Sequence, residues 1–172
     1  MSTFHRLAAA VALVACASTA SAGSVIFSRT AIDHGERQSP DSVQAVFTAS
    51  AQPATLQFRL RGYVSLDGAN DFSEGLDYGD YFHLFVNDQE ILTAGFVMGG
   101  YGENLVLLDL AGAQVDPRTN GVDLGGHTDI SVPVQLVDGE NRIEWRYTTA
   151  VRQGLADEGW SLGKVRVTAA GD

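Results

Sequence analysis

Residues 129–147 read DISVPVQLVDGENRIEWRY, and this stretch decides the fold. Apolar side chains occupy every second position in both halves of it, at 130–136 and again at 143–147. A period of two is typical of a β-strand with one face on a core and the other toward water. Asp138-Gly139 stands between the two runs, and this dipeptide is the strongest short-range signal of a β-hairpin. The stretch therefore predicts two antiparallel strands joined by a tight turn.

Alternating runs recur along the rest of the chain, whereas a helical period does not. They predict about nine strands with no helices between them. One sheet of that many strands would leave long edges exposed and one face wet. We therefore expect an all-β fold, a two-sheet antiparallel β-sandwich with jelly-roll connections. The expected strands are residues 25–28, 43–49, 55–66, 81–86, 89–94, 105–110, 129–137, 141–149 and 160–168.

The connections between these strands are of two kinds. Asn87-Asp88 is a short polar pair between two apolar runs, and it predicts a second tight hairpin. Three connections are long, at residues 30–42, 67–80 and 111–126. Long ordered loops on a rigid sandwich are where binding sites usually lie, so these loops are the first places to look for one.

The last expected strand changes phase part-way along. Trp160 and Leu162 share one parity, whereas Val165 and Val167 share the other. One extra residue in a strand produces this shift, and a glycine inside a strand often marks the place. Gly163 therefore predicts a β-bulge that returns the apolar side chains to the same face.

The N-terminus carries the parts of a secretory signal peptide. Arg6 precedes an unbroken apolar run at 7–15, and the segment closes with the small residues ASA at 20–22. The run is shorter than the roughly 20 apolar residues that a membrane helix needs. We therefore expect a signal peptide at residues 1–22, a single domain at 23–172, and secretion to the extracellular or periplasmic space.

Cys16 allows a second interpretation of the same segment. It is the only cysteine of the chain, and with Leu13-Val14-Ala15 before it the sequence resembles the lipobox of bacterial lipoproteins. The alternative to plain secretion is thus a lipid anchor at Cys16 that holds the domain at the cell envelope. In neither case do we expect a membrane span after the signal segment, because no apolar run there is long enough.

The net charge and the absence of catalytic motifs exclude several classes of function. The 172 residues contain 21 Asp and Glu against 11 Lys and Arg, a formal net charge of −10. Nucleic acids and anionic membranes would repel such a chain, whereas neutral glycans, cations and extracellular proteins would not. The chain has no G-x-S-x-G elbow, no H-E-x-x-H motif and no P-loop, so we expect a protein that is not an enzyme.

The loop at 67–80 concentrates oxygen ligands in a short stretch. Ca²⁺ binds six to eight oxygens from such groups and tolerates irregular geometry, so a bound calcium ion would explain the clustering. The alternative is a solvated loop in which Asp and Asn act only as turn formers. The candidate metal ligands are Asp67, Asn70, Asp71, Glu74, Asp77 and Asp80.

Four aromatic side chains are candidates for contact with a ligand. Tyr78 and Tyr81 flank the acidic loop, Tyr101 lies in a glycine-rich turn, and Trp160 begins the last strand. Exposed rings beside acids and amides could stack on sugar faces while the polar groups bind hydroxyls. The alternative is that these rings fill the core between the sheets.

Two stretches resemble bacterial extracellular sandwich modules of the jelly-roll and concanavalin-like kinds. One is Asp157-Glu158-Gly159-Trp160, which opens a closing strand in such modules, and the other is DYFHLFVN at 80–87. The resemblance implies carbohydrate binding, adhesion or an accessory role in a surface protein.

Three functional hypotheses follow, in order of preference. The first is an exported, non-catalytic carbohydrate-binding module, assisted by calcium, and it predicts exposed tyrosines on one concave surface. The second is a structural or adhesive extracellular protein, which predicts an apolar patch or a bare strand edge. The third is a jelly-roll glycan hydrolase or lyase, which predicts a closed pocket with two converging carboxylates, one with a raised pKa.

Overall fold

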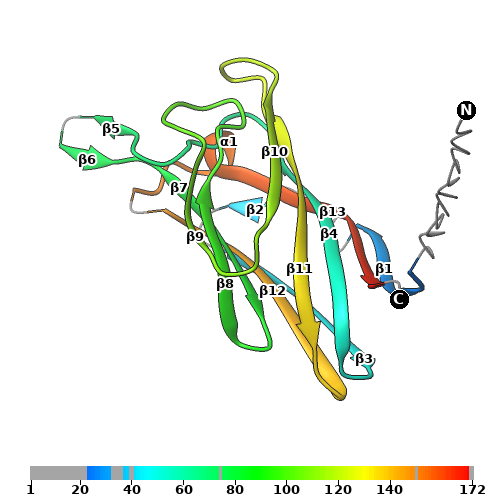
Figure 1. The fold of residues 1–172 in the computed structure, drawn as a ribbon. Helices are drawn as coiled ribbons and strands as arrows, with labels where there is room; N and C mark the ends of the chain where they lie inside the picture. Colours follow the sequence, from blue (N-terminus) through cyan, green and yellow to red (C-terminus); the bar gives the residue numbers. More distant parts are fainter. Residues whose placement is uncertain (1–22, 32–36, 39–40, 74, 150, 171–172) are drawn as a thin grey trace, which may run out of the picture.

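The computed structural model describes residues 23–31, 37–38, 41–73, 75–149 and 151–170. The predicted signal peptide, with Cys16, lies outside these residues. Two antiparallel sheets face each other and confirm the β-sandwich (Figure 1). The six-stranded sheet has the order β1 (Val25–Ala31), β13 (Gly159–Ala169), β4 (Gln52–Gly62), β11 (Gly126–Leu136), β10 (Gln114–Thr119), with β2 (Arg37–Gln38) also paired to β13. The five-stranded sheet has the order β3 (Asp41–Ala49), β12 (Gly139–Thr149), β7 (Asp80–Val86), β8 (Gln89–Gly95), β9 (Leu105–Asp109).

All nine expected strands are present, but the two sheets hold eleven strands. The short strand β2 and the edge strand β10 were not predicted, and neither were the separate hairpin β5 (Phe72–Ser73) and β6 (Leu76–Asp77) and the single-turn helix α1 (Leu155–Glu158). β10 lies in the segment 111–126 that we expected to be a loop. Pro117 weakens its strand pattern, yet an edge strand tolerates proline because one side of it needs no ladder hydrogen bond.

The two predicted hairpins differ in the structure. β7 and β8 pair directly, and Asn87 and Asp88 in their turn have φ angles of 50° and 68°, as a tight primed turn requires. The pairing predicted around Asp138-Gly139 is wrong. β11 pairs with β4 and β10, whereas β12 pairs with β3 and β7, so this turn connects one sheet to the other.

Asn141 explains how such a short connection can cross between the sheets. Its side-chain oxygen accepts the Val137 backbone N–H at 2.9 Å, and its amide donates to the Val137 and Gly139 carbonyls at 2.9 and 3.2 Å. Asn141 is fully buried, so these bonds replace the ladder bonds that a true hairpin would make. Both strands then turn their apolar faces toward the same core.

The core fills the space between the two sheets. Phe58 of β4 contacts both Phe82 of β7 and Trp145 of β12 there, with ring centroids 5.9 and 5.8 Å apart. The predicted bulge in β13 is confirmed, because the register with β4 shifts between Gly163 and Arg166. The shift buries the apolar residues on both sides of it.

The two ends of the sandwich differ (Figure 1). The turns β3–β4, β7–β8 and β11–β12 lie at one end, and the connections after β4, β8 and β10 lie at the other, together with β5, β6 and α1. Residues distant in sequence therefore meet at the second end. No helix in the described part of the chain has the length and hydropathy of a membrane span.

Candidate functional site in the loop end

Three connections are joined by backbone hydrogen bonds at this end. The segment after β4 pairs with the segment after β8: the Leu66 N–H donates to the Met98 carbonyl at 3.2 Å, and the reverse bond is 3.0 Å. The Asp123 N–H, in the connection after β10, donates to the Gly99 carbonyl at 2.8 Å. These bonds give the loops a fixed framework, as a binding site on a sandwich needs.

Gly100 makes one of these close approaches possible. A Cβ at this position would lie 2.1 Å from Oδ1 of Asp67 and 2.7 Å from the Leu66 carbonyl oxygen. The same Asp67 oxygen accepts the Tyr101 backbone N–H at 2.7 Å. The glycine-rich turn therefore lies directly on Asp67 and fixes where Tyr101 leaves the backbone.

A pocket of about 280 Å³ opens between these loops. It brings together four of the ten residues singled out from the sequence, namely Asp67, Asp71, Tyr78 and Tyr101. Among its described lining residues there are four carboxylates and no basic side chain. The other lining residues are Ser65, Asp123, Gln153 and Asp157.

The tyrosines are placed differently from one another. Tyr101 has 60% of its surface exposed, and Tyr78 is partly exposed beside it in the same pocket. Tyr81 does not line the pocket; its hydroxyl donates to Oδ2 of Asp77 at 2.7 Å, and Oδ1 of Asp77 accepts the Gly79 N–H at 3.0 Å. Tyr81 and Asp77 thus stabilise the C-terminal end of the acidic loop through these hydrogen bonds.

Trp160 requires a correction. None of its surface is exposed, and its ring centroid lies 5.1 Å from that of Tyr147, which is also buried. A ring enclosed on both sides cannot stack on a sugar. Its position at the start of β13, where parity turns it toward the core, makes it part of the packing beneath the site.

Asp67 and Asp80 lie at the two ends of the acidic loop and are both buried, Asp67 in the pocket lining and Asp80 outside it. Oδ2 of Asp80 accepts the Asp67 backbone N–H at 3.2 Å, and Oδ1 of Asp80 has no hydrogen-bond partner among the described residues. Burial raises the pKa of Asp80 to about 8, despite the opposing Asp67 N–H bond. Burial also raises the pKa of Asp67 to about 6, and the neighbouring Asp71 charge adds to the shift.

The chain around α1 supplies the far wall. The Ser65 hydroxyl donates to a carboxylate oxygen of Asp157. The buried Glu158 accepts the Gln153 and Gly154 backbone N–H groups at 2.8 and 3.4 Å. A carboxylate that binds backbone N–H groups before a short helix holds that turn in place, so Glu158 is a structural group of the site.

The described carboxylates do not form a calcium cage. No group of three or more acidic, histidine or cysteine side chains is close enough to hold a metal ion within the described ranges. Asn70 is exposed and lies 3.5 Å from Glu103 through its amide, outside the pocket lining. Glu74 lies outside the described residues. Calcium binding by this loop therefore stays a prediction from the sequence.

Four lining residues were missed by sequence reasoning about this site. Ser65, Asp123 and Gln153 belong to three separate connections, and their spacing in sequence carries no signal of proximity. Asp157 had a signal, because it opens the motif Asp157-Glu158-Gly159-Trp160 that carried the family resemblance.

Comparisons with known proteins find matches among solved structures alone. No protein family model and no curated protein matches the chain. Among solved structures, it is similar to a family 35 carbohydrate binding module from an environmental isolate, with 22% identity, TM-score 0.42, and coverage of 88% of this chain and 90% of that one. It is also similar to the CBM35 module of Cellvibrio japonicus Abf62, with 17% identity, TM-score 0.37 and coverage of 88% and 95%. A third is a Xyl-CBM35 in complex with a disaccharide containing glucuronic acid, with 20% identity, TM-score 0.30 and coverage of 90% and 95%.

Proposed function

We propose that this protein is a non-catalytic carbohydrate-binding module whose ligand enters the loop-end pocket. The observation that carries the proposal is the exposed Tyr101 ring in the same pocket as Tyr78 and four carboxylates. An exposed ring offers a flat apolar face to a sugar, while carboxylate oxygens accept hydrogen bonds from its hydroxyls. The absence of basic groups from the described lining favours a neutral sugar over an acidic one.

Preorganisation supports the same proposal. Asp67 receives the Tyr101 N–H, and Ser65 holds Asp157, so two of the acceptors are fixed before a ligand arrives. A site that is ordered in advance loses less conformational entropy on binding. Export of the module, by plain secretion or with a lipid anchor at Cys16, completes the proposal, because cell-wall and matrix polysaccharides lie outside the cell membrane.

A specific observation also favours the adhesive alternative. β9 is an edge strand of the five-stranded sheet, and Val106 and Leu107 on it are 39% and 53% exposed. Leu110, directly after it, is also exposed. An apolar edge strand can accept another protein by strand addition. This surface is separate from the loop-end pocket, so variants of one surface distinguish the adhesive function from the carbohydrate-binding function.

The catalytic alternative has weaker support from the geometry. Asp67 does have a raised pKa of about 6, as a general acid would. However, Asp67 is only 5% exposed, and its carboxylate already accepts the Tyr101 backbone N–H. Burial, which is the largest cause of the shift, accounts for the raised pKa without a catalytic role.

Affinity gel electrophoresis with neutral polysaccharides tests the proposal. We expect retardation by at least one of xylan, mannan and mixed-linkage β-glucan, and about tenfold weaker binding for Tyr101→Ala. Phe72→Ala is the matched control, since Phe72 is 66% exposed but does not line the pocket. Retardation that Tyr101→Ala leaves unchanged would contradict the proposed site, and release of reducing sugar would contradict the non-catalytic role.

A further inference from the structure

The outer face of the six-stranded sheet has the opposite charge from the loop end. Among the described side chains, alternation along the strands places five cations and two carboxylates on this face, although the whole chain has 11 basic and 21 acidic residues. The cations are Arg59, Arg61, Arg118, Lys164 and Arg166, and the carboxylates are Asp116 and Asp129.

Both carboxylates are already paired with arginines of the same face. Arg59 donates two hydrogen bonds to Asp129, one of them at 2.7 Å, and these bonds hold the pKa of Asp129 below its usual value. Arg118 contacts Asp116 at 2.8 Å. Arg61, Lys164 and Arg166 make no ion pair with any described residue, so this face retains positive charge in a chain that is acidic overall.

Lys164, the only lysine of the chain, reaches this face because of the bulge in β13. Leu162 and Val165 both point into the core, so Gly163 and Lys164 are the two residues between inward positions. Lys164 has a φ of 54°, a backbone conformation that favours glycine or asparagine. A strained residue in a bulge that turns a charged side chain outward is typical of a functional surface.

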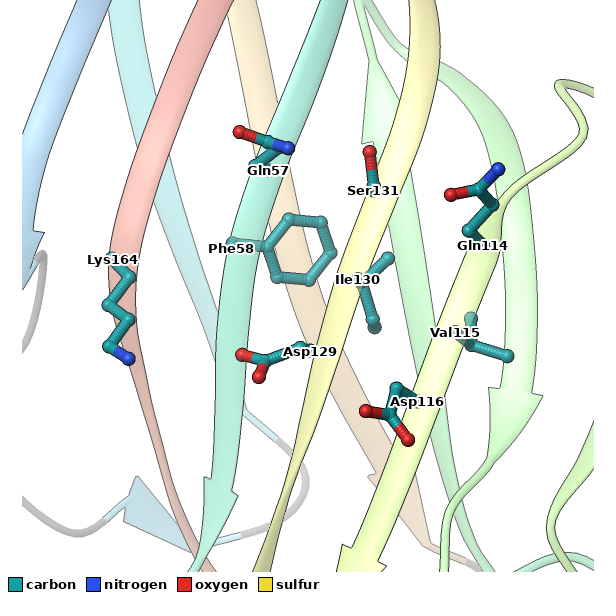
Figure 2. Close-up of a pocket in the computed structure, with 9 residues that line it drawn as sticks. All are labelled: Gln57, Phe58, Gln114, Val115, Asp116, Asp129, Ile130, Ser131 and Lys164. Atoms are coloured by element: carbon teal, nitrogen blue, oxygen red, sulfur yellow. The ribbon is translucent and has the colours of Figure 1, made fainter.

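A pocket of about 390 Å³ lies beside Lys164 (Figure 2). Gln57, Ser131 and Gln114 are cross-strand neighbours on β4, β11 and β10, and their side chains stand in a row across it. Arg166 pairs with Gln57 and extends the row to β13. Four strands span about 14 Å at the usual strand spacing, the length of a short oligomer.

The side chains that line this pocket indicate which class of ligand it can bind. Phe58 and Ile130 are buried with their rings or branches in the core, so the described lining offers no exposed aromatic ring for stacking. The lining offers the side-chain amides of Gln57 and Gln114, the Ser131 hydroxyl and the Lys164 ammonium group. It also holds the carboxylates Asp116 and Asp129, which are paired with Arg118 and Arg59, while Arg166 adds a cation on the next strand. Hydroxyls of a sugar can hydrogen-bond to the amide and hydroxyl groups, and an acidic substituent can pair with the cations.

We propose that the outer face of the six-stranded sheet is a second binding surface, separate from the loop-end pocket, which takes an acidic polysaccharide. Lys164 and Arg166 pair with its anionic groups, and Gln57, Ser131 and Gln114 bind its hydroxyls. The proposal does not depend on the function of the loop-end pocket, because the two surfaces share no lining residue.

Polygalacturonate and its fully methyl-esterified form are matched probes, because they share one backbone and differ in charge. We expect polygalacturonate to bind in affinity electrophoresis or calorimetry, and its ester to bind at least fivefold more weakly. Lys164→Asn/Arg166→Gln should weaken polygalacturonate binding about tenfold, since asparagine suits the positive φ and keeps the bulge. Lys164→Arg, which keeps the charge, should bind as the wild type does.

Tyr101→Ala separates this proposal from the one for the loop-end pocket. We expect it to leave polygalacturonate binding unchanged. Equal binding of the acid and the ester would overturn the proposed ligand class, and no binding of either would overturn the surface itself. Loss of polygalacturonate binding in Tyr101→Ala alone, with the Lys164/Arg166 variant unaffected, would place the acidic ligand in the loop-end pocket and refute the second surface.

Discussion

The loop-end pocket and the outer sheet face belong to the same sandwich, yet they differ in almost every property that governs recognition. The pocket is lined by carboxylates and exposed tyrosines, whereas the described part of the sheet face carries more cations than carboxylates, and its pocket has amides but no exposed aromatic ring. A net charge of −10 describes neither of them. The comparison teaches that overall charge limits the partners of a protein only where the charge is evenly distributed.

The difference has a local physical origin. Turns favour Asp, Asn and Gly for backbone reasons, so loops accumulate acidic groups wherever the chain reverses. A sheet face instead collects one side chain from every second residue of several strands, and cross-strand pairs decide which charges tolerate one another. Arg59 with Asp129 is such a pair, and among the described residues Lys164 has no ion pair of its own.

The largest expected effect is on the framework of the loop end. Gly100→Ala places a methyl group 2.1 Å from Oδ1 of Asp67, so either the turn or the acidic loop must move. We expect a loss of about 1–3 kcal/mol in the free energy of unfolding, measured by thermal denaturation, together with loss of neutral-glycan binding. Gly163→Ala is the control, because its Cβ would meet only the Thr30 carbonyl at 3.3 Å.

Polygalacturonate binding sharpens the outcome of Gly100→Ala. If the two surfaces are independent, Gly100→Ala should retain binding of the acidic polymer while it loses the neutral one. Loss of both in a variant that remains folded would show that the sheet face depends on the loop end.

The next effect concerns pH and the buried acids. Their pKa values of about 8 for Asp80 and about 6 for Asp67 lie above the unfolded value, so the folded state binds more protons than the unfolded state between about pH 4 and 8. The contribution of these two acids to the free energy of unfolding is therefore fully present below pH 4, and it is lost as the pH rises toward 8. We expect the melting temperature to fall over this range.

Asp80→Asn should remove most of that dependence. Asparagine keeps an acceptor for the Asp67 N–H but carries no charge, so we expect a gain of about 1–3 kcal/mol at pH 8 and little change at pH 4.5. Asp116→Asn is the control, because Asp116 is exposed. A wild-type melting temperature that rises with pH from 4.5 to 8 would contradict the assignment of Asp80 as a buried acid.

Ionic strength distinguishes the two surfaces at the level of binding. We expect an increase from 50 to 500 mM NaCl to weaken polygalacturonate binding about tenfold, because salt screens exposed charge pairs. Neutral-glycan binding at Tyr101 should change less than twofold. Calorimetry at the two salt concentrations gives both values. If salt weakened the binding of both ligands equally, the sheet face would not bind by charge pairing while the pocket binds by stacking, and the proposed difference between them would be wrong.

The smallest expected effect concerns calcium. Since no three described acidic, histidine or cysteine side chains lie close enough together to hold a metal ion, we expect millimolar CaCl₂ to raise the melting temperature by no more than about 2 °C relative to EDTA. The measurement is a thermal melt in both buffers with wild type and Asp71→Ala. A rise of several degrees that Asp71→Ala removes would restore the calcium site predicted from the sequence, with Glu74 as a further ligand.

Parts of the site were predictable because they lie close together in the chain. Asp67, Asp71 and Tyr78 share one loop, so their proximity needed only the assumption that the loop is ordered. Tyr101 was predicted from its glycine-rich turn alone. Trp160 was wrong as a ligand residue because exposure depends on which sheet covers a strand end, and a local pattern does not contain that information.

The sequence by itself predicted nine of the eleven strands in the two sheets, where β7 turns into β8, and where β13 must bulge, since each of these depends on neighbours a few residues apart. Only the tertiary structure decided that β11 and β12 belong to opposite sheets, although Asp138-Gly139 indicates a hairpin between them. Alternating apolar residues indicate that a strand has one apolar face, but this face can be buried whether the strand belongs to one sheet of the sandwich or to the other. Strand order is decided by pairings across the whole chain, and it alone brings Ser65, Asp123 and Asp157 into one pocket and Lys164 onto another face.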